Sequence, residues 1–91
     1  MSKFREFISE ENEEALFLTE AIFDKALIGV GRRCGQPSIA VYDAKQLIDC
    51  YMEMGMTHEE AEEFFEYNTV GAWLGEHTPI FVTILDPVLI D

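Results

Sequence analysis

Two helix starts separated by one tight turn constrain the fold of this chain most strongly. Asp43 and Thr57 are both good N-cap residues, and each is followed three positions later by the Gln or Glu of a capping box. Gly55 lies between the two segments, at a position where glycine readily ends a helix. The sequence therefore predicts an αα-hairpin, with a first helix from Asp43 to Gly55 and a second that ends between Gly71 and Gly75.

The size and charge of the chain limit the partners that it can have. Its 91 residues suffice for one small domain, and 48% of them are hydrophobic, which is enough for a modest core. The 18 acidic and 6 basic residues give a net charge of −12. Nucleic acids and anionic membranes attract basic patches, so neither is expected as a direct partner. A basic protein surface is the partner that this charge favours.

The cysteines and apolar runs indicate a cytoplasmic protein. Cys34 and Cys50 have neither CxxC spacing nor the density of a disulfide framework, and no signal peptide precedes them. We expect two reduced thiols. The longest apolar runs are too short to span a bilayer.

The N-terminal part predicts a lead-in followed by a helix. Residues 1–8 read as a frayed or strand-like segment, and Ser9 is a candidate N-cap before a run of glutamates. The helix would extend to about Phe23. Leu16 and Phe23 fall opposite its main apolar stripe, which predicts either a helix buried on both sides or a contact between copies in a homo-oligomer.

Three strands complete the expected fold. Residues 26–30 and 38–42 predict a β-hairpin around a loop with Arg32 and Arg33, and residues 78–85 predict a closing strand. The predicted fold class is α+β in a single domain covering residues 1–91. It has an N-terminal helix, a β-hairpin, an αα-hairpin and a closing strand, forming a small, mostly antiparallel sheet with helices on one face.

The acidic face of the second hairpin helix is the first candidate binding surface. Helical spacing places four glutamates together and away from the apolar face: Glu59, Glu62, Glu63 and Glu66. Since they point to water, a catalytic role is disfavoured, and the plainer interpretation is a surface that only keeps the protein soluble. The functional alternative is attraction of a basic partner protein.

A second hypothesis is a small-molecule or nucleotide pocket near Asn68, Tyr42 and the Arg32–Arg33 loop. Asn68 falls on the apolar face of its helix, so we expect it to be buried and hydrogen-bonded to loop backbone, or to lie at the base of a pocket. The two arginines could hold a phosphate, or could simply pair with acids of the same protein. Trp73 could anchor an interface or fold back on the sheet edge.

Motifs of enzymes and metal sites are lacking. The sequence has no GxSxG, HExxH or P-loop, and the glycines of the 29–35 loop do not form GxGxxG. The spacings of His58, His77 and the two cysteines match no common structural zinc pattern. We therefore predict a protein that is not an enzyme and that needs neither a cofactor nor a metal.

Three segments between Phe23 and Val82 resemble a family of small uncharacterised bacteriophage and prophage proteins. These segments are FDKALIGVGRRCGQPSIAVYD, GMTHEEAEEFFEYN and GAWLGEHTP. The resemblance implies a phage-related origin and supplies no active-site residues. Small accessory phage proteins often bind and modulate a host protein, including nucleic-acid-binding defence proteins that negative charge can engage. We therefore expect such a role, in the cytoplasm of the host cell.

Overall fold

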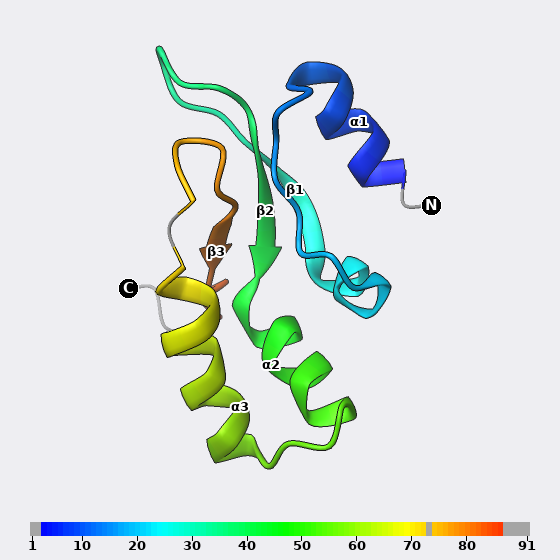
Figure 1. The fold of residues 1–91 in the computed structure, drawn as a ribbon, viewed down its shortest axis with the longest axis vertical. Helices are drawn as coiled ribbons and strands as arrows, with labels where there is room; N and C mark the ends of the chain where they lie inside the picture. The colour runs from blue at the N-terminus through cyan, green and yellow to red at the C-terminus, as the bar shows by residue number, and fades with distance from the viewer. Residues whose placement is uncertain (1–2, 73, 87–91) are drawn as a thin grey trace.

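The computed structural model describes residues 3–72 and 74–86 of the chain (Figure 1). It contains helical segments before and after a pair of strands, and a short third strand follows them. In chain order the elements are α1 (Lys3–Glu11), the 3-10 helix η1 (Ala21–Ala26), β1 (Leu27–Gly31), β2 (Ile39–Asp43), α2 (Ala44–Glu53), α3 (His58–Phe64), the π-helix η2 (Phe65–Val70) and β3 (Ile80–Val82).

The three strands form one sheet in the order β1-β2-β3. Strands β1 and β2 make the predicted antiparallel hairpin, whose register shifts between Leu27 and Gly29. Strand β3 pairs with β2 in the parallel direction, with Tyr42 opposite Phe81. The α+β class is confirmed, but the sheet is mixed rather than mostly antiparallel. The reason is that the αα-hairpin carries the chain back to the starting end of β2 before β3 begins, and such a crossover makes two strands parallel.

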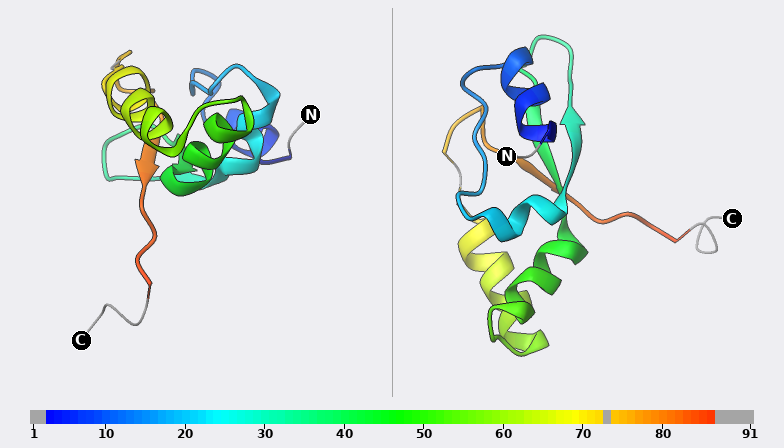
Figure 2. Two further views of the ribbon diagram at one scale, coloured as in Figure 1. Left: turned by 90° about the horizontal axis from the view of Figure 1, so that it is seen from below. Right: turned by 90° about the vertical axis from the view of Figure 1, so that its right-hand side faces the viewer.

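The core lies on the face of the sheet that carries Tyr42, where η2 and the chain around Leu18 pack. Tyr42 stacks on Phe81 at a ring-centroid distance of 6.0 Å, and Phe65 of η2 packs edge-on against Phe81 at 5.8 Å. On the same side, the Leu18 backbone N–H donates to the Tyr42 hydroxyl at 3.0 Å. Figure 2 shows α2 and α3 side by side beyond the end of β2, with η1 beside α2. The described part of the chain therefore shares one core.

The αα-hairpin forms as predicted. The Asp43 carboxylate accepts the Lys45 N–H, and the Gln46 amide donates to the same carboxylate rather than closing a full capping box. The Thr57 capping box is complete, and Gly55 ends the first helix with a φ of 109°. These local hydrogen bonds satisfy backbone groups that a helix end leaves unpaired.

The predicted N-terminal helix is wrong in position. Helix α1 covers the segment expected to be a lead-in and contains Ser9, and its Ile8 is buried. The chain then leaves the helix at Asn12, whose side-chain oxygen accepts the Glu14 N–H in a turn. Asn12 competes successfully with helical hydrogen bonding because its short amide can bond its own backbone.

The chain between α1 and η1 is irregular, which removes the argument for a homo-oligomer. Leu16 lies in this irregular stretch, and Phe23 belongs to η1 and is buried in the core. The two apolar sides expected of a single helix are therefore side chains of a segment that packs across the sheet. Oligomerisation stays a prediction without structural support.

The prediction that Asn68 is buried is also wrong. Along α3 and η2 the inward positions are Ala61, Phe65 and Thr69, while Asn68 is exposed. The cause is the π-helix, whose i→i+5 hydrogen bonds widen each turn and move the inward position on by one residue. The Gly71 N–H donates to the Glu66 carbonyl at 3.2 Å in this pattern.

Strand β3 is shorter than the predicted closing strand. It starts at Ile80, directly after Pro79, which has no N–H to give to the ladder with β2. It ends at Val82, beyond which Ile84 and Leu85 are exposed. As an edge strand, β3 needs hydrogen bonds on one side only.

Candidate functional site

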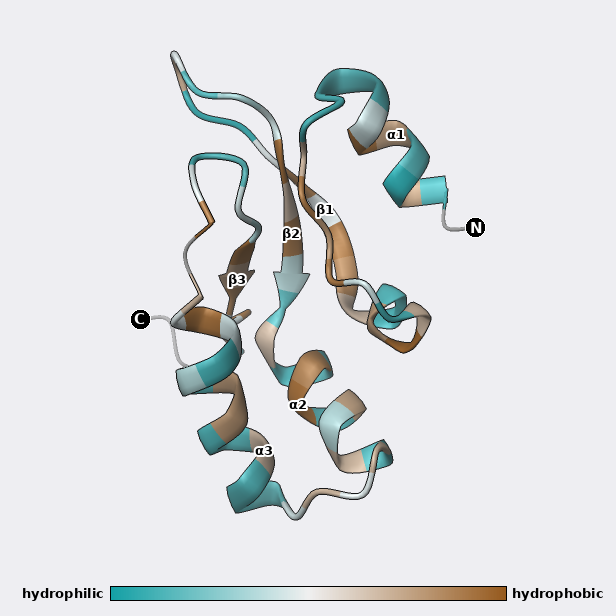
Figure 3. Cartoon of the chain, in the orientation of Figure 1, coloured by the Kyte–Doolittle hydropathy of each residue, from teal (hydrophilic) through white to brown (hydrophobic). Residues whose placement is uncertain are grey.

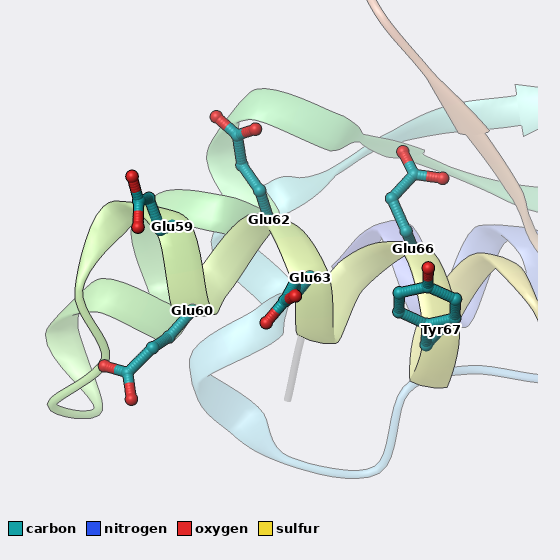
Figure 4. A pocket seen from close by; sticks show the side chains of 6 residues that line it. All are labelled: Glu59, Glu60, Glu62, Glu63, Glu66 and Tyr67. Carbon is teal, nitrogen blue, oxygen red and sulfur yellow. The ribbon is translucent and has the colours of Figure 1, made fainter.

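The four predicted glutamates form a fully exposed surface on α3 and η2. Glu59, Glu62, Glu63 and Glu66 are all exposed and, with Glu60 and Tyr67, line a shallow depression (Figure 4). All six side chains come from one helical run, so they diverge into solvent and enclose no cavity. Figure 3 shows the same hydrophilic stripe along α3. We call Glu59, Glu62, Glu63 and Glu66 the acidic surface.

The acidic surface has two sides. In Figure 4, Glu59, Glu62 and Glu66 point to one side of the helix, whereas Glu60 and Glu63 point to the other. His58 contacts Glu62 at 3.1 Å, one helical turn away. The Glu60 carboxylate accepts the Thr57 N–H in the capping box. This bond, and to a smaller extent the Thr57 side chain, lowers the pKa of the Glu60 carboxyl below the ordinary value.

Three of the six lysines and arginines form ion pairs elsewhere in the fold. Arg5 pairs with Asp24 at 2.7 Å and Lys25 with Glu53 at 2.9 Å, while Arg32 pairs with Glu11. Within residues 3–72 and 74–86, no lysine or arginine forms an ion pair with the acidic surface. Apart from the contact of Glu62 with His58, the described residues therefore leave the negative charge of the acidic surface without a cationic partner.

The arginine loop takes the plainer of its two predicted roles at Arg32. The Arg32 guanidinium donates twice to the Glu11 carboxylate, and this pairing lowers the pKa of Glu11. The Ser38 hydroxyl also donates to Glu11 and lowers its pKa by a smaller amount. Arg33 is exposed and lies with Arg32 beside Pro79 and Ile80, around an open depression of about 360 Å³. Arg32 thus ties the hairpin tip to α1, and both arginines flank the start of β3.

The pocket predicted near Tyr42, Asn68 and the arginines does not assemble. Tyr42 has no exposed surface, and burial raises the pKa of its hydroxyl. Asn68 is exposed and lines a different depression from that of Arg32 and Arg33. These residues do not come together because the Tyr42 ring points into the core, where it lies between Leu18 and Phe81.

Asn68 instead borders an apolar groove that the sequence did not reveal. The groove runs between α3 with η2 on one side and the chain around residues 18–23 with the end of α2 on the other, and its volume is about 240 Å³. We call it the aromatic groove, after the side chains that form its floor and rim: Phe23, Tyr51, Met54, Phe64, Leu74 and Phe81.

Asn12 and His77, a polar pair that the sequence did not connect, have a structural role. The Asn12 amide donates to the Ser38 carbonyl at 2.8 Å and contacts His77 Nδ1 at 3.0 Å, while His77 Nε2 lies 3.0 Å from the Glu14 carboxylate. These contacts tie the turn after α1 to the β-hairpin and to the loop before β3. No local pattern indicates them, because Asn12 and His77 are 65 positions apart.

The remaining candidates give no catalytic arrangement. Cys50 is buried, its thiol contacts the Ile22 carbonyl at 3.4 Å, and burial raises its pKa, so the protonated and unreactive form is favoured. In the two described stretches, no three His, Cys, Asp or Glu side chains come close enough to hold a metal ion. Trp73 lies outside the described residues.

Membrane insertion receives no support from the helices. None of those in the described ranges combines the length and apolar character that a bilayer crossing requires.

Comparisons with known proteins return no relative of this chain. No protein-family model matches it, no curated protein matches it, and no solved structure resembles it significantly.

Proposed function

We propose that this protein is a non-enzymatic binding protein whose acidic surface engages a basic surface of another protein and thereby modulates that protein. The resemblance to small phage proteins favours a host protein as the partner, including one that itself binds nucleic acid. The observation that carries the proposal is the exposed negative charge of Glu59, Glu62, Glu63 and Glu66.

The physics of such a surface favours fast encounter with a basic partner. Exposed charges on one face raise association rates by roughly 10- to 1000-fold, and salt weakens this steering. Isolated surface ion pairs add only about 0–1 kcal/mol each to affinity, so the charge acts mainly on the rate of association. An exposed helix with satisfied caps can present these side chains without rearrangement.

The test compares two variants that change the net charge equally. The first replaces Glu59, Glu62, Glu63 and Glu66 by Gln. The control replaces four exposed acids that belong to other parts of the molecule, namely Glu6, Glu10 and Glu13 by Gln and Asp49 by Asn. Both should keep the urea midpoint and helical spectrum of the parent.

The partner is isolated from host lysate at low salt and identified, and association rates with the purified partner are then measured at two salt concentrations. We expect the first variant to associate about tenfold more slowly at low salt, and the control to lose far less, because its charges are further from the contact. Equal slowing in both variants would mean that only net charge matters, and unchanged rates in the first would remove the proposal.

A further inference from the structure

We infer that the aromatic groove binds an amphipathic helix of the partner whose polar face is basic. This inference rests on the proposed function, since it uses part of the same negative charge, and it adds the chemical class of the partner. It is carried by the groove itself, its apolar rim, Glu20 on one of its walls, and Glu60 and Glu63 in the depression that adjoins the other wall.

The floor of the groove is a packed aromatic layer. Tyr51 contacts Phe23 at a ring-centroid distance of 5.3 Å and Phe64 at 5.0 Å, both edge-on. The Tyr51 hydroxyl bonds to Thr69 Oγ1, and burial raises the pKa of this tyrosine, so the floor stays neutral. Such a floor is already formed in the chain without a partner.

The rim is apolar and accessible. Met54 is 48% exposed, Phe64 39% and Leu74 73%. Methionine side chains adapt to irregular apolar surfaces, and Met56 lies between the groove and the acidic side of α3. Rim side chains of this kind leave apolar area in water that a partner can cover.

The dimensions favour side chains of a macromolecule over a small ligand. Small-molecule sites usually bury most of the surface of their ligand, whereas the groove, of about 240 Å³, is open to solvent along its rim. It continues past Phe64 and Asn68 into a more open depression of about 420 Å³ that Glu60 and Glu63 border. An elongated shallow surface suits one or two apolar anchors with polar groups beside them.

Carboxylates border this surface from both walls. Glu20 lines the groove on the side of the chain before η1, and Glu60 and Glu63 lie on the side of α3. An apolar anchor in the groove would thus be flanked by negative charge on each side. Complementarity requires basic residues on both sides of the apolar stripe, which an amphipathic helix supplies.

A helix fits better than a strand or a second copy of this chain. A strand binds by pairing its backbone with a free strand edge, but the groove is walled by helices and loops, with β3 contributing Phe81. A helix satisfies its own backbone and needs only side-chain contacts. A second copy would bring another net charge of −12 against acidic walls.

The test uses three synthetic peptides of equal length, with binding measured by fluorescence anisotropy at low salt. The first has Leu and Phe at helical spacing i, i+3, i+4 and i+7 and Lys or Arg elsewhere. The second has the same composition in an order that destroys the apolar stripe. The third keeps the stripe and replaces the basic residues by Gln and Ser.

Two pairs of variants locate the contact. Leu74→Ser removes an exposed rim side chain, and its control Ile84→Ser removes an equally solvated apolar side chain after β3. Glu20→Gln with Glu63→Gln removes charge from both walls, and its control Glu59→Gln with Glu66→Gln removes the same charge from the other side of α3.

We expect the basic amphipathic peptide to bind at least tenfold more tightly than either of the other peptides. Leu74→Ser should weaken binding of this peptide by about tenfold, because it removes apolar area that the peptide would cover, while Ile84→Ser should not weaken it. The double variant Glu20→Gln with Glu63→Gln should lose more affinity for this peptide than the control, Glu59→Gln with Glu66→Gln.

The failures of this inference and of the proposed function give different results. Equal binding of the two basic peptides overturns the groove assignment and leaves the charge-based function standing. Equal binding of the basic and uncharged amphipathic peptides contradicts the charge-based function. It also contradicts the role that this inference gives to the carboxylates beside the groove. Loss of affinity in Ile84→Ser as large as in Leu74→Ser, or no binding of any peptide, also overturns the groove assignment.

Discussion

The αα-hairpin and the chain between α1 and η1 are ordered by different kinds of contact. In the hairpin, caps at Asp43 and Thr57 act within three residues, and one apolar face of each helix packs on the core. The chain around Leu18 has no regular structure and is held by polar groups from far along the sequence. Tyr42 accepts the Leu18 N–H, and Arg5 donates to the Leu18 carbonyl.

This difference predicts how each region responds when a side chain is removed. The hairpin depends on buried area, so its loss should be cooperative and large when a core side chain is removed. The Leu18 region buries its apolar side chains only in part and depends more on a few hydrogen bonds, each worth about 0.5–1.5 kcal/mol net. Removing one should release that region while the rest of the fold persists.

The largest effect is expected from Leu47→Ala in α2. Leu47 has no exposed surface, and deleting a buried leucine side chain typically costs about 2–5 kcal/mol. Urea unfolding followed by circular dichroism should show a lower midpoint. Met52→Ala on the same helix is the control, because Met52 is 39% exposed. A loss no larger than that of the control would mean that packing does not hold the hairpin.

A smaller and more local effect is expected from Tyr42→Phe. The ring stays packed on Phe81, but the Leu18 N–H loses its acceptor, which costs about 1–3 kcal/mol. Hydrogen exchange at the Leu18 amide should accelerate by about tenfold per 1.4 kcal/mol, with little change at amides of α3. Uniform acceleration across the protein would contradict the difference between the two regions. Tyr67→Phe, at an exposed ring, serves as the control.

The smallest effect is expected from Asn68→Leu. Because Asn68 is exposed and Thr69 takes the inward position, the free energy of unfolding should change by no more than about 0.5 kcal/mol. Thr69→Val should cost more, since it leaves the buried Tyr51 hydroxyl without its partner. A larger loss of stability in Asn68→Leu than in Thr69→Val would instead support the regular helix predicted from the sequence, in which Asn68 points inward.

The candidate site was predictable in part. The outward position of Glu59, Glu62, Glu63 and Glu66 follows from helical spacing once Thr57 sets the helix start. The aromatic groove was not predictable, because one of its walls contains residues 18–23, which are more than 40 residues from Phe64 on the opposite wall. Leu18 and Leu74 illustrate this: neither lies in a regular element, and only the fold brings them to the same groove.

The sequence by itself determined the elements whose signals are local. Asp43, Gly55 and Thr57 mark helix ends through hydrogen bonds and a backbone conformation within a few residues, so their positions do not depend on the rest of the fold. The hairpin around the Arg32–Arg33 loop and the α+β class follow in the same way. Tertiary structure decided the rest. Helix α1 contains Ser9 and ends before Asn12, where the local bond to Glu14 is reinforced by contacts of the Asn12 amide with Ser38 and His77. Thr69 replaced Asn68 as the inward residue of a π-helix, where its hydroxyl meets that of Tyr51. In both cases the deciding partner is distant in sequence, so no local pattern could reveal which of two comparable local conformations would be stabilised.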